Sequence, residues 1–392
     1  MTLTVAQEHI TMTRRLRLGM VGGGQGAFIG AVHRIAARID DRFELVAAAL
    51  SSDPQRAQAS ADELGVARSY ASWDEMARAE AARGDGIDAV SIVTPNHLHA
   101  PVATAFLNAG IHVICDKPLA MTLAEGEALA KLARDKNRLF ALTHTYSGYP
   151  MVRHARELVD AGELGEVRVV QVEYAQDWLA KPIELTGENR QAVWRTDPKQ
   201  AGRAGCLGDI GTHAYHLAAF VTGMLPVEVA AELHTFVEGR PVDDHIQAML
   251  RYDTGARGML WASQVASGAE NALRLRVYGT KAGIAFDQES PNELLFTPLG
   301  GATQRLTRAR VDSAVARHAT RVPAGHPEGY LEAFAQLYKD AALQIEAIDA
   351  GLPLPPESRL LTTVDDGVAG LRFIDAVFKS DAKLEWSRVG NG

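Results

Sequence analysis

The chain has 392 residues, 47% of them apolar, and a formal net charge of −8 at pH 7. This length exceeds one typical domain core, so two domains are expected. The negative charge and the lack of a basic stripe exclude nucleic acid and anionic membranes as expected partners.

Cysteine content and the N-terminal sequence indicate the compartment. Cys115 and Cys206 are the only cysteines, too few for a disulfide framework or a cysteine-built metal site. Residues 1–15 lack the apolar run of a signal peptide, and residues 1–13 are predicted to be a loose leader. Because no apolar stretch is long enough to span a bilayer, we expect a cytoplasmic protein.

A glycine-rich turn follows the first predicted strand. The apolar run 16–21 is long enough for one buried strand, GGGQGA occupies 22–27, and a helical pattern begins after Phe28. Glycines let the loop backbone approach a pyrophosphate, and free N–H groups at the helix start bind its charge. This is the fingerprint of a dinucleotide-binding βαβ unit. The candidate cofactor contacts here are Gly22, Gly24, Gln25, Gly26, Ala27 and Phe28.

The spacing leaves the third small residue of the fingerprint open. Gly22-x-Gly24-x-x-Ala27 fits the motif with alanine in third place. Alternatively, the loop is longer and Gly30 takes that role. For the glycines alone, a plain tight turn is the competing interpretation.

The end of the second predicted strand, 43–50, bears on cofactor choice. It leads into Ser51-Ser52-Asp53-Pro54, where NAD-binding folds usually place an acid for the ribose. Ser51, Ser52 and Arg56 could instead hold the 2′-phosphate of NADP. Asp53, extended before Pro54, is suited to cap the next helix. NAD and NADP both stay open, and we expect only modest discrimination between them.

Strands and helices then alternate. Strands are predicted over 87–93, 111–115 and 139–143, and helices over 57–64, 100–109 and 123–136. This spacing predicts a parallel sheet with helices on both faces, and ligands beyond the carboxyl ends of its strands. Thr94, Asn96, His99, Asp116 and Lys117 fall at these ends and are candidate cofactor contacts. Turn chemistry is the alternative for Thr94 and Asn96, and a structural role is the alternative for His99, as for His33.

The pattern changes near residue 146. Helices are predicted over 151–161, 328–348 and 364–378, and strands over 167–174, 229–236, 245–252, 258–266, 273–278 and 284–286. Asp253-Thr254-Gly255 is a hairpin signal. We predict an α/β protein with a Rossmann domain over 1–145. The second domain, over 146–392, is built on a large, mainly antiparallel open sheet, and a second subunit is expected to cover its free face.

In order and spacing, the motifs resemble the glucose–fructose oxidoreductase, inositol dehydrogenase and rhizopine catabolism (Gfo/Idh/MocA) family, over nearly the whole chain. The landmarks are Gly30-x-x-His33, Thr94-Pro95-Asn96 with His99, Asp116-Lys117-Pro118, Trp194-Arg195 and Asp209-Ile210-Gly211-Thr212-His213. The chain departs from the family pattern in a longer glycine loop, in Asp116 where glutamate is commoner, and in residues 202–205 (GRAG). The resemblance implies a Rossmann domain followed by an open-sheet α/β domain.

The resemblance also implies a catalytic set. Alcohol oxidation by a nicotinamide needs a base, and imidazole titrates near working pH. Asp209 and His213 are four residues apart, so one helical turn places them on one side. The family implies that His213 takes the proton, Asp209 orients substrate and imidazole, and Lys117 hydrogen-bonds the reacting hydroxyl. We expect oxidation to rise with pH through one group near neutrality; an interior structural histidine is the alternative for His213 alone.

Further residues are candidates for the substrate pocket. Tyr146 and Arg195 are predicted to bind substrate with Lys117, Asp209 and His213, and Tyr149, Asp177 and Trp178 could also shape the pocket. A role in packing alone is the alternative for Tyr146 and Arg195 as for these three residues. No metal is expected, because His97, His99 and His112, or His213 and His216, bring no third ligand at zinc spacing.

The predicted function is an NAD(P)-dependent dehydrogenase acting on a secondary alcohol of a sugar, glycoside or inositol-like polyol. One alternative is a hydrolase or lyase whose tightly bound NAD is reduced and reoxidised in each turnover. Another is a non-catalytic NAD(P)-binding sensor, against which the intact Lys117, Asp209 and His213 set argues. The expected partners are a small carbohydrate and further copies of the chain, in a homodimer or homotetramer.

Overall fold

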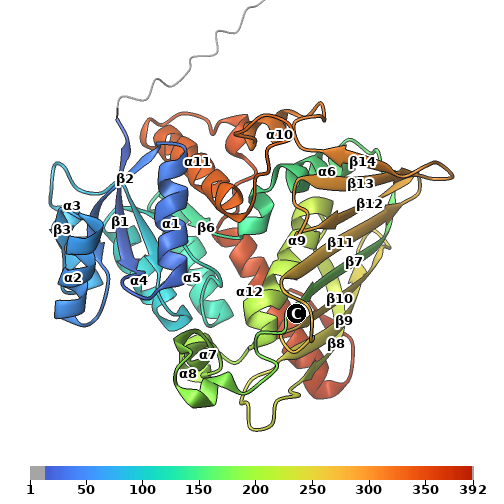
Figure 1. The fold of residues 1–392 in the computed structure, drawn as a ribbon, viewed down its shortest axis with the longest axis horizontal. Helices are drawn as coiled ribbons and strands as arrows, with labels where there is room; N and C mark the ends of the chain where they lie inside the picture. Colours follow the sequence, from blue (N-terminus) through green and yellow to red (C-terminus); the bar gives the residue numbers. More distant parts are fainter. Residues whose placement is uncertain (1–13, 391–392) are drawn as a thin grey trace, which may run out of the picture.

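The computed structural model describes residues 14–390 as two β-sheets with helices packed between and around them (Figure 1). The predicted leader, residues 1–13, lies outside the described residues. Within residues 14–390, no helix is both long and apolar enough to cross a membrane.

The first sheet has six parallel strands in the order β3-β2-β1-β4-β5-β6, as predicted for a Rossmann fold. Strand order reverses between β1 and β4, and this switch point opens a crevice at their carboxyl ends. All five residues of β4 are buried, as expected for a parallel strand covered on both faces. The strands are β1 (Leu16–Gly22), β2 (Phe43–Ala49), β3 (Arg68–Ser69), β4 (Ala89–Val93), β5 (His112–Cys115) and β6 (Phe140–Leu142).

Five helices connect these strands: α1 (Phe28–Ile39), α2 (Pro54–Leu64), α3 (Trp73–Ala81), α4 (His99–Asn108) and α5 (Leu123–Asp135). Strand β3 and helix α3 are not among the predicted elements. The strand has only two polar residues, too few for a periodic signal. The helix does carry a capping signal, because the Ser72 hydroxyl accepts the Glu75 N–H.

The second sheet has nine strands in the order β14-β13-β12-β11-β7-β10-β9-β8-β15. Neighbours pair antiparallel except β7 and β10, which are parallel, so the mainly antiparallel prediction is confirmed with one exception. Strands β13, β14 and β15 were not predicted. The strands are β7 (Val167–Ala175), β8 (Pro226–His234), β9 (His245–Tyr252), β10 (Arg257–Ser263), β11 (Ala272–Gly279), β12 (Ala282–Asp287), β13 (Glu293–Pro298), β14 (Gln304–Thr307) and β15 (Ser387–Arg388).

Helices cover one face of this sheet, and the other face is open (Figure 1). Helix α9 (Thr212–Thr222) packs on β7 and β11, and α12 (Val364–Lys383) packs on β8. Helices α6 (Pro150–Asp160), α7 (Arg190–Arg195), α8 (Pro198–Ala201) and α10 (Ala314–His318) also belong to this half of the chain. Met249 and Met259, paired across β9 and β10, are each more than half exposed on the open face. Residues 14–390 therefore cover this sheet on one side only.

Helix α11 (Tyr330–Asp349) returns to the first sheet and packs on α1. Phe334 and Tyr338 of α11 join one buried cluster with Leu18 and Phe43. The Tyr338 hydroxyl also lies 2.8 Å from Nδ1 of the buried His33. A segment far along the chain therefore completes the core beside the dinucleotide fold.

Candidate active site

A cavity of about 740 Å³ opens at the carboxyl ends of the first sheet, where the βαβ pattern predicts the ligand. The two halves of the chain both contribute to it. Its lining includes residues 22–27, Ser51, Ser52, Arg56, Ser72, Trp73, residues 94–98, residues 116–118, Gln191, Trp194, Arg195, Ala201, Gly205 and Asp209.

The geometry of the glycine loop decides which residue is the third small one. Gly22, Gly23 and Gly26 have φ values of 79°, 73° and 80°, which L side chains rarely adopt. A Cβ on Gly30 would lie only 2.5 Å from Cα of Gly23. Gly30 therefore provides the close helix–loop packing, and Ala27 is the residue before α1. The longer-loop interpretation is the one that the structure supports.

The end of β2 presents hydroxyls and a guanidinium to the cavity. Ser51, Ser52 and Arg56 line it. Asp53 is not among the lining residues; its Oδ1 accepts the N–H of Arg56 at 2.9 Å and caps α2. The Asp53 carboxylate therefore serves as the N-cap of α2, as its position before Pro54 predicts.

Two of the predicted cofactor contacts, His99 and Phe28, do not line the first cavity. His99 does not line the cavity, because its ring is buried between the carbonyl oxygens of Pro118 (2.6 Å) and Thr94 (2.9 Å). These contacts favour the structural role given as the alternative for His99, whose ring holds two strand-end turns together. Phe28 lines a second cavity instead. Asn96 stays on the first cavity, and its amide donates to the Ala201 carbonyl at 2.9 Å, tying the two halves of the chain together.

The second cavity, of about 460 Å³, adjoins the first. Asp116, Lys117, Gln191, Arg195 and Asp209 line both, so one continuous space runs from the glycine loop to the second sheet. Predicted substrate residues Tyr146 and His213 and the candidate Trp178 line the second cavity. With them are Thr143, Thr145, Tyr174, Gln176, Asn271 and Tyr330, which were not predicted.

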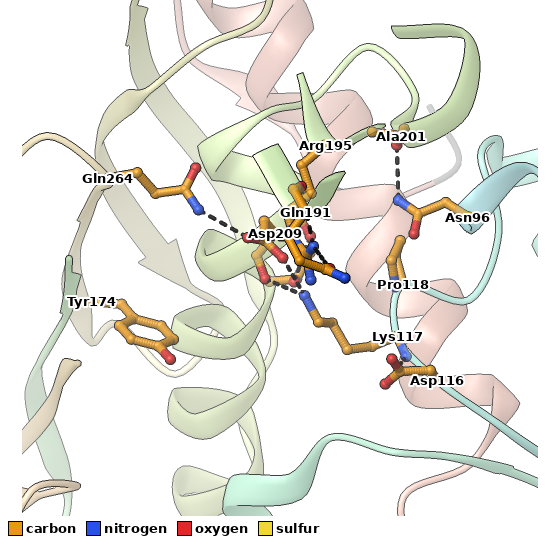
Figure 2. A network of polar contacts seen from close by, with 12 residues as sticks. Asn96, Asp116, Lys117, Pro118, Tyr174, Gln191, Arg195, Ala201, Asp209 and Gln264 are labelled. Carbon is orange, nitrogen blue, oxygen red and sulfur yellow. Dashed lines mark hydrogen bonds and ion pairs between the residues drawn. The ribbon is translucent and has the colours of Figure 1, made fainter. Parts of the chain in front are cut away.

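Lys117 and Asp209 meet at the junction of the two cavities (Figure 2). Lys117 Nζ lies 2.7 Å from Oδ1 of Asp209 and donates to its carbonyl oxygen at 2.6 Å. The other carboxylate oxygen accepts from Gln264 at 2.9 Å and lies 3.4 Å from Nε of Arg195. Burial alone would raise the pKa of Asp209, but the charges of Lys117 and Arg195 outweigh it and hold the pKa below its usual value. The carboxylate is ionised at neutral pH.

Asp209 lies in a π-helical turn, Leu207–Gly211, and not in the regular helical turn that was predicted. Wide turns of this kind occur mostly inside helices and often at functional sites. The buried Asp243 anchors the turn, since its carboxylate accepts the N–H groups of Gly205 and Leu207, both at 2.7 Å. Asp209 and His213 still face one cavity, as their spacing predicts.

His213 is the second residue of α9 and is only 8% exposed. Its ring centroid lies 4.8 Å from that of Tyr146 and 5.6 Å from that of His144. Burial, assisted by the positive charge of Lys117, lowers the pKa of His213 well below 6.5. This corrects the expectation of titration near neutrality. The imidazole is neutral at pH 7 and able to accept a proton.

Two residues considered for the substrate pocket, Tyr149 and Asp177, make their hydrogen bonds outside it. The Tyr149 hydroxyl accepts from Gln288 at 3.1 Å, and Asp177 accepts the backbone N–H of Gly268 at 3.0 Å. Neither lines the second cavity. Arg195 does, and its guanidinium stacks on the Trp194 ring at 4.2 Å.

Gln264, Tyr174 and Asn271 are site residues without a sequence signal. Gln264 follows β10, Tyr174 belongs to β7 and Asn271 precedes β11, and the pairing of β7 with β10 and β11 brings the three residues together. Within residues 14–390 there is no group of three or more His, Cys, Asp or Glu side chains placed to hold a metal ion.

The first cavity fits a dinucleotide. A Cβ on Gly24 would lie 2.8 Å from the Leu50 carbonyl oxygen, so the loop can pack this close to the end of β2 only with glycine there. The Thr94 hydroxyl is buried on this cavity without a partner among the described residues. A glycine cradle at a Rossmann switch point, joined to a cavity with a lysine, a carboxylate and a neutral histidine, defines the class: an NAD-binding oxidoreductase.

Comparison with known proteins agrees with this class. Residues 16–144 match the model of the oxidoreductase family with an NAD-binding Rossmann fold, and residues 152–285 match the GFO/IDH/MocA C-terminal domain. The chain belongs to the Gfo/Idh/MocA oxidoreductase family.

Solved and curated relatives span nearly the whole chain. An oxidoreductase from Sinorhizobium meliloti is 49% identical, with a TM-score of 0.85 over 95% of this chain and 99% of that one. An inositol dehydrogenase homologue from Azotobacter vinelandii, solved with NADH and myo-inositol, is 34% identical, with a TM-score of 0.87 over 96% and 98%. Levoglucosan dehydrogenase of Pseudarthrobacter phenanthrenivorans is 29% identical over 96% of this chain and 98% of its own.

Proposed function

We propose that this protein is an NAD(P)-dependent dehydrogenase that oxidises a secondary alcohol of a sugar, glycoside or inositol-like polyol. The observation that carries the proposal is the position of Lys117 and Asp209 where the first cavity meets the second, with His213 on the second cavity. The inositol dehydrogenase homologue and levoglucosan dehydrogenase among the relatives support this substrate class.

Each of the three residues has a task that its surroundings fit. NAD, when bound, supplies the hydride acceptor. His213, neutral because it is buried, accepts the hydroxyl proton at a ring nitrogen. Lys117 donates to the hydroxyl oxygen and stabilises negative charge that develops there. Asp209 holds the lysine ammonium in place and accepts from the substrate.

The cofactor residues follow from the first cavity. We propose that residues 22–27 hold the pyrophosphate with the start of α1, and that Thr94, Asn96 and Asp116 lie beside the nicotinamide ribose. Ser51, Ser52 and Arg56 lie where an adenosine ribose would end, and no lining carboxylate opposes a 2′-phosphate there. We therefore propose that NADP is accepted along with NAD.

The organisation of the molecule is proposed on the same basis. Residues 1–145 form the cofactor domain and 146–392 the substrate domain, with α11 packed back onto the first. The open sheet face, with exposed Met249 and Met259, is proposed to contact further copies in a homodimer or homotetramer. The cytoplasm, which supplies the cofactor, suits the two buried free thiols, Cys115 and Cys206.

A substrate screen tests the proposed activity. The purified protein is mixed with NAD or NADP and a panel of inositols, aldoses and 1,6-anhydrosugars, and the absorbance at 340 nm is followed. Oxidation of at least one compound is expected, and Lys117→Ala should abolish it. Product release from a glycoside without net change at 340 nm would favour the internal redox cycle of a hydrolase or lyase. Cofactor binding without any turnover would favour the sensor.

A further inference from the structure

One wall of the second cavity is a continuous chain of hydrogen-bonded side chains. Trp178 Nε1 lies 3.1 Å from Oε1 of Gln176, and Gln176 Nε2 lies 2.7 Å from Oδ1 of Asn271. The Tyr174 hydroxyl is 2.6 Å from that same Asn271 oxygen and 2.5 Å from the Tyr146 hydroxyl. All five residues line the cavity. We call these five residues the polar wall.

The direction of each hydrogen bond in the polar wall can be determined from one end. An indole N–H can only donate, so the Gln176 oxygen accepts from Trp178 and its NH₂ group faces Asn271. Asn271 must then present its oxygen to Gln176. A separate contact agrees, because the Asn271 NH₂ group donates to Oε1 of Gln288 at 3.1 Å.

This order determines where the two phenol protons lie. Tyr174 has one proton and faces the Asn271 oxygen, which can only accept, so Tyr174 donates to Asn271. Its own oxygen must accept from Tyr146. Burial raises the pKa of both tyrosines, so both keep their protons at neutral pH. With both protons used inside the wall, the two oxygen atoms can offer only lone pairs to a ligand.

The hydroxyl oxygens of Tyr146 and Tyr174 share the second cavity with the proposed base, His213, and with hydrogen-bond donors. The Tyr146 and His213 ring centroids are 4.8 Å apart, and those of Tyr174 and His213 are 6.2 Å apart. Lys117 and Arg195 supply positive charge to the same cavity. In Figure 2 the Tyr174 ring lies to one side of the Lys117–Asp209 pair, and all three residues line the second cavity. A ligand in this space meets donors on one side and acceptors on the other.

We propose that Tyr146 and Tyr174 select substrates that carry a second hydroxyl next to the reacting carbinol. The reacting hydroxyl gives its proton to His213, while the neighbouring hydroxyl donates to a tyrosine oxygen. The substrate class is thereby narrowed to ring compounds with a vicinal diol. This inference rests on the proposed dehydrogenase function and deepens it.

The test compares each substrate with an analogue that lacks one hydroxyl. D-Glucose is measured against 2-deoxy-D-glucose, and myo-inositol against its monodeoxy analogues, with NAD as the oxidant. A buried acceptor left without a donor costs about 1–3 kcal/mol, or about 5- to 150-fold. We expect wild-type kcat/KM to drop by at least about 5-fold on the analogue that lacks the neighbouring hydroxyl.

Tyr146→Phe and Tyr174→Phe should lower kcat/KM for the diol and leave the deoxy analogue nearly unchanged. The diol-to-deoxy ratio should then move toward one. Tyr149→Phe is the matched control, because this tyrosine ends the Gln288 branch outside the cavity and its loss should keep the wild-type ratio. The thermal midpoint and the NADH dissociation constant of each variant check folding and the cofactor site.

Two results separate the inference from the function on which it rests. Turnover of the panel with an unchanged diol-to-deoxy ratio in Tyr146→Phe and Tyr174→Phe would overturn the selection by the polar wall and leave the dehydrogenase intact. A protein that binds NADH yet oxidises no member of the panel would overturn the proposed function, and the selection with it.

Discussion

Nζ of Lys117, at the end of β5 in the first sheet, lies 2.7 Å from Oδ1 of Asp209 in the π-helical turn before α9. The pair joins the cofactor half of the chain to the substrate half. Both residues are mostly buried, with side chains 14% and 19% exposed, so solvent screens the interaction only weakly. The two residues should therefore act as one unit in catalysis.

Asp209→Asn should lower kcat on the order of 10²- to 10³-fold. The neutral amide keeps the shape but leaves Lys117 and Arg195 without their counter-charge. Because the pair acts together, Lys117→Ala with Asp209→Asn should be no slower than Lys117→Ala alone. Steady-state kcat values of the wild type, the two single variants and the double variant form a double-mutant cycle. An NADH fluorescence titration should show that each variant retains its affinity for the cofactor. Effects that multiply in the double variant would contradict a shared role.

His213→Ala should abolish most turnover while the protein still binds NADH. General-base help from a positioned imidazole is worth on the order of 10²- to 10⁴-fold. His216→Ala is the control, because His216 lies one helical turn away and does not line the second cavity. Near-normal kcat in His213→Ala would remove this residue as the base.

The pH profile follows from the low pKa of His213. The base must be neutral to accept a proton, so the rate rises with pH through its pKa and then levels off. Because burial places that pKa well below 6.5, oxidation should be almost flat from pH 6.5 to 8 and fall only in more acidic buffer. The measurement is kcat/KM across pH 5 to 9, with a deuterated substrate to establish that hydride transfer limits the rate. A half-maximum at or above pH 6.5 under those conditions would refute the neutral, desolvated base.

The loop after β2 predicts tolerance of both cofactors. We expect the kcat/KM values for NAD and NADP to differ by less than roughly 10³-fold, about 4 kcal/mol. Arg56→Ala should weaken NADP selectively, because only NADP carries the 2′-phosphate that a guanidinium binds. Asp53→Asn keeps the helix cap and should leave the ratio unchanged, since the carboxylate faces the start of α2. A larger preference, or a ratio controlled by Asp53, would contradict this arrangement of the loop.

Gly30→Ala tests the close packing of α1 against the glycine loop. The added methyl would lie 2.5 Å from Cα of Gly23, which is backbone and cannot rotate away. We expect a loss of about 1–3 kcal/mol in stability and weaker NAD binding as the loop shifts. Gly370→Ala, in α12, should instead be neutral or slightly stabilising, because a methyl added there would meet no neighbour within 4 Å. Equal NAD affinity in wild type and Gly30→Ala would argue against Gly30 as the third small residue.

Buried histidines should make the fold sensitive to acid. Burial lowers the pKa of His33 and His216 to about 4, so between pH 6.5 and 4 the unfolded chain binds more protons than the folded one. The free energy of unfolding therefore decreases as the pH is lowered through this range, by at most about 1.4 kcal/mol per pH unit for each histidine. Burial raises the pKa of Asp243 to about 6, which opposes part of this loss.

Urea unfolding at pH 7, 6 and 5 measures the slope. His216→Phe, which removes one of these groups and keeps an aromatic ring beside His144 and Phe220, should make the slope shallower. His234 is exposed, so the control variant His234→Asn should show the same slope of stability against pH as the wild type. A stability that is constant from pH 7 to 5 would show that the buried histidines do not control it.

Local features of the site were predictable from the sequence. The glycine run between an apolar strand and a helix predicts the dinucleotide cradle, because both depend on neighbouring residues. Asp53 before Pro54 predicts a helix cap for the same reason. The spacing of Asp209 and His213 places them on one side of a turn, whether the turn is α or π. Motifs of this kind are decided by backbone geometry over a few residues.

Other features depend on contacts between distant segments. The choice of Gly30 over Ala27 rests on packing against Gly23. Tyr174 and Asn271 meet only because β7 pairs with β11 across about a hundred residues, and no periodicity encodes that pairing. The low pKa of His213 results from burial by several segments of the chain, which together exclude water from its ring. The sequence alone therefore determined which residues can do the chemistry, while the tertiary structure decided their neighbours and charge states, because desolvation and long-range pairing are properties of the packed chain.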